Sequence, residues 1–195
     1  YKNINSLEKT DSRELVKGTI LINLKKYSEA ETIFKTISKS SKDKDLKEKG
    51  YLKLAELYLL QNKYNEIINL NKDYESEKYK SKEMNDYIAI AYLRLGQFEK
   101  SREKYNENIN LSPDEKGNNL LMIAESYYNE EKFAEAKKYY KQVYDTEKNK
   151  ELKKKAFYSL ILVANAMNDS NELIKLSNSF RKEYPNSDYQ EEISY

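Results

Sequence analysis

The sequence contains no cysteine and no histidine, and only 4 glycines and 2 prolines in 195 residues. Without cysteine the chain has no disulfide, no thiol nucleophile and no thiolate metal site, and without histidine it lacks the commonest general base and metal ligand. The shortage of glycine and proline excludes the turn-rich pattern of a β-sandwich or barrel. These absences indicate an all-α protein that is not an enzyme of a familiar kind, and we expect it to use no cofactor and no metal.

The chain also lacks an excess of charge of either sign, because 35 basic residues are mixed with 33 acidic ones and the net charge is only +2. Such a balance creates no field that would gather nucleic acid or anionic lipid. Acidic residues interrupt even the densest basic run, which consists of Lys148, Lys150, Lys153, Lys154 and Lys155. This interleaving is typical of a solvated helix face, so we expect no nucleic-acid partner.

No apolar run is long enough to cross a bilayer, which requires about 20 residues. The longest apolar stretch extends from Phe157 to Met167 and contains Ser159 and Asn165, so it predicts a buried helix. The abundance of lysine, asparagine, isoleucine and tyrosine is typical of an AT-rich bacterial genome. Because the sequence begins at Tyr1 rather than at methionine, a removed leader is compatible with it, and both the bacterial cytoplasm and the cell envelope remain open as locations.

What the sequence does contain is an internal repeat, visible as an aromatic residue followed by a glutamate-containing turn into a second helix. Four copies begin at Tyr27, Tyr64, Phe98 and Phe133, and a fifth begins at Ser170, where the aromatic residue is lost; successive copies are 37, 34, 35 and 37 residues apart. A period near 34 residues is the signature of stacked helical hairpins.

The residues within each period resemble the tetratricopeptide repeat (TPR) family. Small and aromatic residues recur at the family's packing positions, most clearly in the fourth copy with Leu120, Ile123, Ala124, Tyr127, Ala136 and Tyr140, and in the first with Gly18, Leu21, Ala30 and Phe34. Small residues allow close approach of two helices, and the aromatic residues fill the spaces between hairpins. The resemblance implies an all-α, right-handed α-α superhelix, or solenoid, of about five hairpins plus a terminal helix.

We expect one array over residues 1–195, with units at 11–44, 48–80, 82–115, 117–150 and 154–187. Pro113 and Pro185 mark the ends of the third and fifth units, since proline does not continue a helix. Residues 188–195 are expected to start a further helix, so the array either continues beyond this chain or ends in a capping helix. The second helix of the fifth unit fits the pattern least well, because Leu173 and Ser177 replace the usual residue types.

Other motifs have ordinary explanations. Asp43-Lys44-Asp45 lacks the further oxygen ligands and the glycine of a calcium loop, so a solvated turn is expected there. Ser-x-x-Lys occurs at Ser6, Ser41, Ser101 and Ser179, at a frequency that chance explains. No glycine-rich phosphate loop is present.

In members of this family the first helices line a concave face that holds partner segments. At the corresponding inward positions the groove would mix apolar side chains with acids and amides: Leu52, Glu56, Leu59, Asp86, Ile90, Arg94, Leu121, Glu125, Tyr128, Tyr158, Leu162 and Asn165. Family members that grip a C-terminal carboxylate carry Lys, Asn or Arg at the fifth position, where this chain has Leu15, Leu52, Asp86, Leu121 and Tyr158. The resemblance therefore implies a protein or peptide ligand held by apolar contacts rather than a chaperone tail.

The sequence thus predicts a non-catalytic scaffold that binds a protein or peptide. Two alternatives remain open. The segment Phe180–Ser187 is similar to hairpin ends in bacterial envelope assembly lipoproteins, so the chain could be the repeat region of such a protein. It could equally be the sensor module of a larger regulator.

Overall fold

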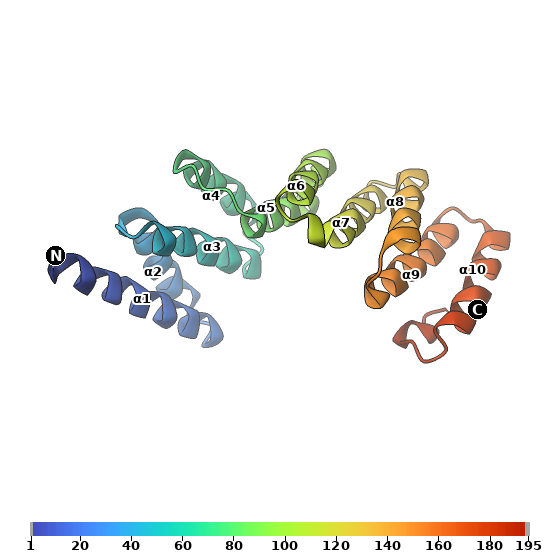
Figure 1. Cartoon of the computed structure of the whole chain (residues 1–195), viewed down its shortest axis with the longest axis horizontal. Helices are drawn as coiled ribbons and strands as arrows, with labels where there is room; N and C mark the ends of the chain where they lie inside the picture. Colours follow the sequence, from blue (N-terminus) through green and yellow to red (C-terminus); the bar gives the residue numbers. More distant parts are fainter. Residues whose placement is uncertain (1, 194–195) are drawn as a thin grey trace. The chain divides into compact units, whose positions relative to one another are not determined.

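The computed structural model describes residues 2–193, with side chains described from residue 10 onward. The chain divides into two compact units, residues 1–95 and residues 96–195, and short turns join consecutive helices within each (Figure 1). No strand occurs in residues 2–193. The division falls within the third expected hairpin (82–115), whose two helices belong to different units.

The first unit contains α1 (Lys2–Asn23), α2 (Tyr27–Ser40), α3 (Lys44–Leu60), α4 (Tyr64–Ser76) and α5 (Lys82–Arg94). The second contains α6 (Phe98–Leu111), α7 (Lys116–Asn129), α8 (Phe133–Thr146), α9 (Lys150–Ala166) and α10 (Ser170–Glu183), together with the short 3₁₀ helices η1 (Pro113–Glu115) and η2 (Asp188–Gln190).

One turn geometry recurs between the two helices of the hairpins. Lys25, Asn62, Glu131 and Asn168 adopt positive φ angles of 59, 56, 61 and 56°, and Gly96, with φ 71°, occupies the corresponding place after α5. The amide of the residue after each non-glycine turn residue donates to a carbonyl five residues back, for example Lys132 N to Tyr127 O at 2.9 Å. A left-handed residue closed by such a bond is a common way to end a helix, and here it reverses the chain within each repeat.

Side-chain caps begin several of the remaining helices. Asp43 accepts hydrogen bonds from the amides of Asp45 and Leu46 at 2.8 and 3.0 Å, Ser81 caps α5, and Asn149 caps α9. Each cap satisfies amides that have no partner inside the helix. The Asp43 segment is therefore a helix start.

In the first unit, α1 packs on α2, α2 on α3, α3 on α4 and α4 on α5. Small residues allow this close packing: a Cβ atom built on Gly18 would lie 2.5 Å from the ring of Phe34, and Ala30 and Ala55 are fully buried. The core continues through Leu54, Ile67, Tyr74 and Ile88 among others. The apolar face of each hairpin is thus buried against the next one, as expected for stacked repeats.

In the second unit, α6 packs on α7, α7 on α8, α8 on α9 and α9 on α10. A cation is enclosed between α6 and α7, where Arg102 Nη1 lies 2.7 Å from Glu130 Oε2 and its guanidinium stacks 4.0 Å from the ring centre of Tyr127. Arg102 also donates to Ser126 Oγ at 3.2 Å. Because the charge is paired and hydrogen-bonded, its burial is tolerated.

The segment after α10 folds back onto α9 and α10. Ile193 is buried in a cluster with Phe157, Ile161 and Phe180, and Arg181 Nη2 donates to the carbonyl of Ile193 at 2.6 Å. Within the region expected to start a further helix, residues 188–190 form η2 and residues 191–193 form a turn. Residues 194 and 195 lie outside the described residues.

Candidate functional site

The predicted groove residues of the first unit lie on α3 and α5. Leu52, Glu56 and Leu59 of α3 and Asp86 and Ile90 of α5 are half-buried, whereas Arg94 is exposed. The two acids already have partners on their own helices: Lys53 lies 2.7 Å from Glu56, and Lys82 lies 2.6 Å from Asp86. These charges are therefore partly neutralised within the chain.

The predicted residues of the second unit come together. A cavity of about 360 Å³ is lined by Leu121, Glu125 and Tyr128 from α7 and by Tyr158 and Leu162 from α9. Asn165, the sixth predicted residue of this unit, is exposed and does not line the cavity. Leu121 is only 2% exposed, so it belongs to the core as well as to the cavity wall.

Five further residues line this cavity: Asn129, Tyr140, Lys155, Ser159 and Tyr189. Tyr140 comes from α8 and fits the pattern of a packing aromatic residue. The sequence therefore does not reveal that its side chain also lines the cavity. One face of α9 carries residues at helical spacing: Lys155, Tyr158, Ser159 and Leu162. This spacing could have identified Lys155 and Ser159 from the sequence. Tyr189 reaches the cavity only because the chain folds back after α10.

The aromatic rings around the cavity are held in place by neighbours. The rings of Tyr158 and Tyr189 stack with centres 4.1 Å apart and an angle of 8° between their planes, while Tyr128 meets Phe133 edge to face at 5.4 Å. The Tyr158 hydroxyl donates to a carboxylate oxygen of Glu192. These contacts give the cavity a preformed aromatic wall.

Two charged residues line the cavity: Glu125, which is half-buried, and Lys155, which is exposed. Burial raises the pKa of Tyr140 above its ordinary value, and the charge of Glu125 raises it further. Tyr140 therefore stays neutral at physiological pH and presents a phenol.

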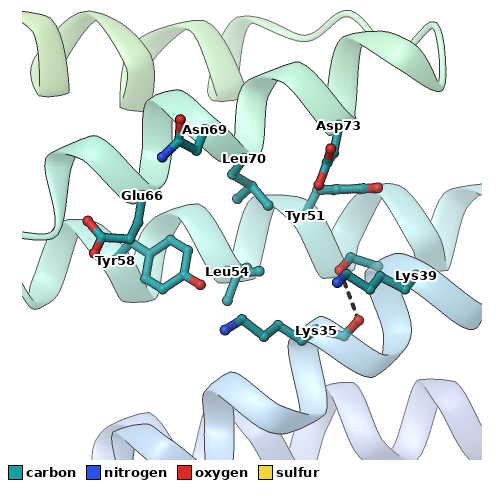
Figure 2. A pocket seen from close by; sticks show the side chains of 10 residues that line it. Lys35, Lys39, Tyr51, Leu54, Tyr58, Glu66, Asn69, Leu70 and Asp73 are labelled. Carbon is teal, nitrogen blue, oxygen red and sulfur yellow. Dashed lines mark hydrogen bonds between the residues drawn. The ribbon is translucent and has the colours of Figure 1, made fainter.

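A second cavity, of about 190 Å³, lies in the first unit among α2, α3 and α4 (Figure 2). In Figure 2 the Lys35 side chain extends past Leu54 toward the Tyr58 hydroxyl. Burial acts to raise the pKa of Glu31, but Lys35 and Lys63, at 2.6 and 3.4 Å, hold it below its ordinary value. The Lys35 charge is thus already used inside the protein, and none of the predicted groove residues lines this cavity.

The basic run at the start of α9 is likewise engaged with its surroundings. Lys154 lies 2.6 Å from Glu151, and the ammonium of Lys153 lies 5.0 Å from the ring centre of Tyr144. The part of the chain that the structure describes contains no cluster of three or more acidic or metal-binding side chains suited to a metal ion. No helix in residues 2–193 has the length and apolar character to cross a membrane.

Comparison with known proteins gives a consistent answer about the fold. Residues 119–149 match the family model described as Tetratricopeptide repeat. A search among curated proteins found no significant match.

Solved structures resemble the chain over most of its length. A MamA protein is 14% identical with a TM-score of 0.73, covering 91% of this chain and 93% of its own. A tetratricopeptide repeat protein from Parabacteroides merdae is 16% identical with a TM-score of 0.72, covering 92% and 68%. Nearly identical TPR-like repeats from Podosopora anserina, whose name refers to a kinesin light chain, are 13% identical with a TM-score of 0.69, covering 88% and 93%. These likenesses confirm the predicted all-α repeat fold.

Proposed function

We propose that this chain, a tetratricopeptide-repeat protein, binds a segment of another protein along its first helices and catalyses no reaction. Proteins of this fold generally act as protein-interaction scaffolds and use extended concave surfaces to do so. The observation that carries the proposal is the cavity between α7 and α9, which gathers five of the residues that the repeat pattern assigns to the partner-binding face.

The size and lining of this cavity suit a side chain of a bound segment. A volume of about 360 Å³ lies in the range of known ligand pockets, which are mostly apolar with a few polar groups that set orientation. Leu121, Leu162 and the tyrosine rings supply apolar contact, and Glu125, Asn129 and Ser159 supply polar groups. A protruding side chain would be held here while the flanking residues of the segment lie along the exposed first-helix positions of α7 and α9.

Site-specific photo-crosslinking tests the assignment. Leu162 is 37% exposed, so a benzoyl-phenylalanine at this position will preserve the fold while facing the cavity. The matched control carries the same group at Lys138, an exposed position on α8 that does not line the cavity.

Crosslinking in the native host should yield a discrete protein adduct from position 162 and not from position 138. Substituting Tyr158→Ala in the same background should remove that adduct. Equal adducts from both positions, or an adduct that survives Tyr158→Ala, would place the binding surface elsewhere.

A further inference from the structure

The two acids at the ninth position of the first helix differ in their surroundings. Glu56 in α3 and Glu125 in α7 occupy the same place in their repeats. Glu56 is paired at 2.7 Å with Lys53, three residues before it. At the position equivalent to Lys53, α7 carries Met122, so Glu125 lacks the cation that its counterpart has.

No other side chain replaces that cation. Within residues 10–193 the carboxylate of Glu125 takes part in no ion pair, although it is half-buried in the wall of the cavity. A carboxylate that is partly removed from water interacts more strongly with an opposite charge than one on the open surface, because the local dielectric is lower. Glu125 is therefore available to pair with a positive group of a ligand.

The rest of the cavity wall is also suited to a cation. Tyr128, Tyr140, Tyr158 and Tyr189 contribute four aromatic rings, and the faces of such rings attract a guanidinium or an ammonium group. The hydrogen bond from Tyr158 to Glu192 brings a second carboxylate beside the stacked pair of rings. An arginine side chain combines a planar cation with an apolar stem and matches both the carboxylate and the rings.

One group opposes this preference. Lys155 also lines the cavity, but it is exposed whereas Glu125 is half-buried. Water screens an exposed ammonium more effectively than a half-buried carboxylate, so Glu125 dominates the interior of the cavity.

From these contacts we infer that the cavity between α7 and α9 receives a cationic side chain, an arginine, from the bound protein segment, with Glu125 as its ion-pair partner. The inference rests on the proposed function and adds the chemistry of the ligand. Apolar residues beside the arginine would contact Leu121 and Leu162.

Blocked heptapeptides with leucines on both sides of the central residue test this assignment. The central residue is arginine, its neutral isostere citrulline, or glutamate, and binding to the full chain is measured by ¹H–¹⁵N chemical-shift titration. We expect the arginine peptide to bind about 5-fold more tightly than the citrulline peptide, as a partly buried charge-assisted hydrogen bond warrants, and to shift resonances of α7 and α9.

Three variants separate the charge from the shape of the cavity. Glu125→Gln should abolish the preference for arginine over citrulline. Met122→Lys should have the same effect by supplying the internal partner that Lys53 gives Glu56. Lys155→Met should instead strengthen arginine binding by about 2-fold, since it removes a repelling charge. Glu135→Gln, at an exposed position on α8 that does not line the cavity, is the matched control and should change nothing.

The possible outcomes are distinct. Equal binding of arginine and citrulline, or tighter binding of the glutamate peptide that Lys155→Met abolishes, would overturn the inference and leave the binding site itself in place. If no peptide shifts resonances of α7 or α9, the proposed function of this cavity fails, and the inference fails with it.

Discussion

Gly50 lies directly against the backbone of the preceding hairpin, and replacing it with alanine should destabilise the first unit. A Cβ atom at this position in α3 would lie 2.8 Å from Ser38 N and 3.1 Å from Ser38 Cα, both in the backbone of α2, and 3.0 Å from Ile37 Cγ2. Ser38 and Ile37 are 1% and 2% exposed. Burial of both residues limits how far they can shift to accommodate a methyl group.

Two opposing effects set the magnitude. Alanine is favoured over glycine inside a helix by about 1 kcal/mol. Forcing an extra methyl group into a packed contact costs about 1–3 kcal/mol, and the upper part of that range applies where the obstacle is backbone. The net loss in the free energy of unfolding should therefore be about 1–2 kcal/mol.

Gly117→Ala provides the matched control. At Gly117 the three atoms nearest to a Cβ would all belong to the Glu147 side chain, the nearest being a carboxylate oxygen at 1.8 Å, and that side chain is only half-buried. Because a flexible side chain can rotate away, the change in the free energy of unfolding should stay within about 0.5 kcal/mol.

Urea unfolding followed by far-ultraviolet circular dichroism measures both variants. Since repeat arrays need not unfold in two states, hydrogen–deuterium exchange should accompany it and should show faster exchange in α2 and α3 for Gly50→Ala alone. If Gly50→Ala is as stable as the parent chain, or if Gly117→Ala is equally damaging, the close α2–α3 packing is not the reason for a glycine at this position.

Three further predictions concern single contacts. Glu131→Gly should raise the free energy of unfolding by about 1 kcal/mol in urea denaturation, because Glu131 has a φ of 61°, a conformation that glycine adopts without strain; a less stable variant would contradict this. Arg102→Met should lower the free energy of unfolding by about 1–2 kcal/mol, since Glu130 loses one cation but keeps Lys132 at 2.7 Å. An unchanged urea midpoint would show that the Arg102–Glu130 pair contributes nothing to stability. Hydrogen bonding to Lys132 in the first place, and to Arg102 in addition, holds the pKa of Glu130 below its ordinary value. The stability from this group is therefore present above about pH 4.5 and lost as the pH falls through the lower folded-state pKa, so Glu130→Gln should flatten the loss of stability between about pH 5 and pH 3.

The repeat could be predicted from sequence because its physical basis is local and periodic. The small residues Gly18, Ala55 and Ala124 recur at one position of the first helix, where only a small side chain lets the neighbouring helix approach. The left-handed turn residues recur with the same period; Asn62 and Asn168 are of a type that adopts this conformation readily, whereas Lys25 and Glu131 give no local sign of it. Their geometry follows from the pairing of the helices on either side.

The candidate site could be predicted only in part. The pattern of the first helices named Glu125, Tyr128, Tyr158 and Leu162, because residues on one helix face share a periodicity that the chain itself displays. It could not say that Asn165, on the same helix, stays outside the cavity. That outcome depends on where the second helices and the end of the chain lie.

The sequence by itself therefore determined the helical hairpins and the face on which each residue lies, since both depend on neighbours within one turn or one repeat. Tertiary structure decided which of those faces enclose a cavity. Tyr189 joins the cavity only because the segment after α10 packs back onto α9. Similarly, Glu125 lines a cavity only because packing brings α7 and α9 together.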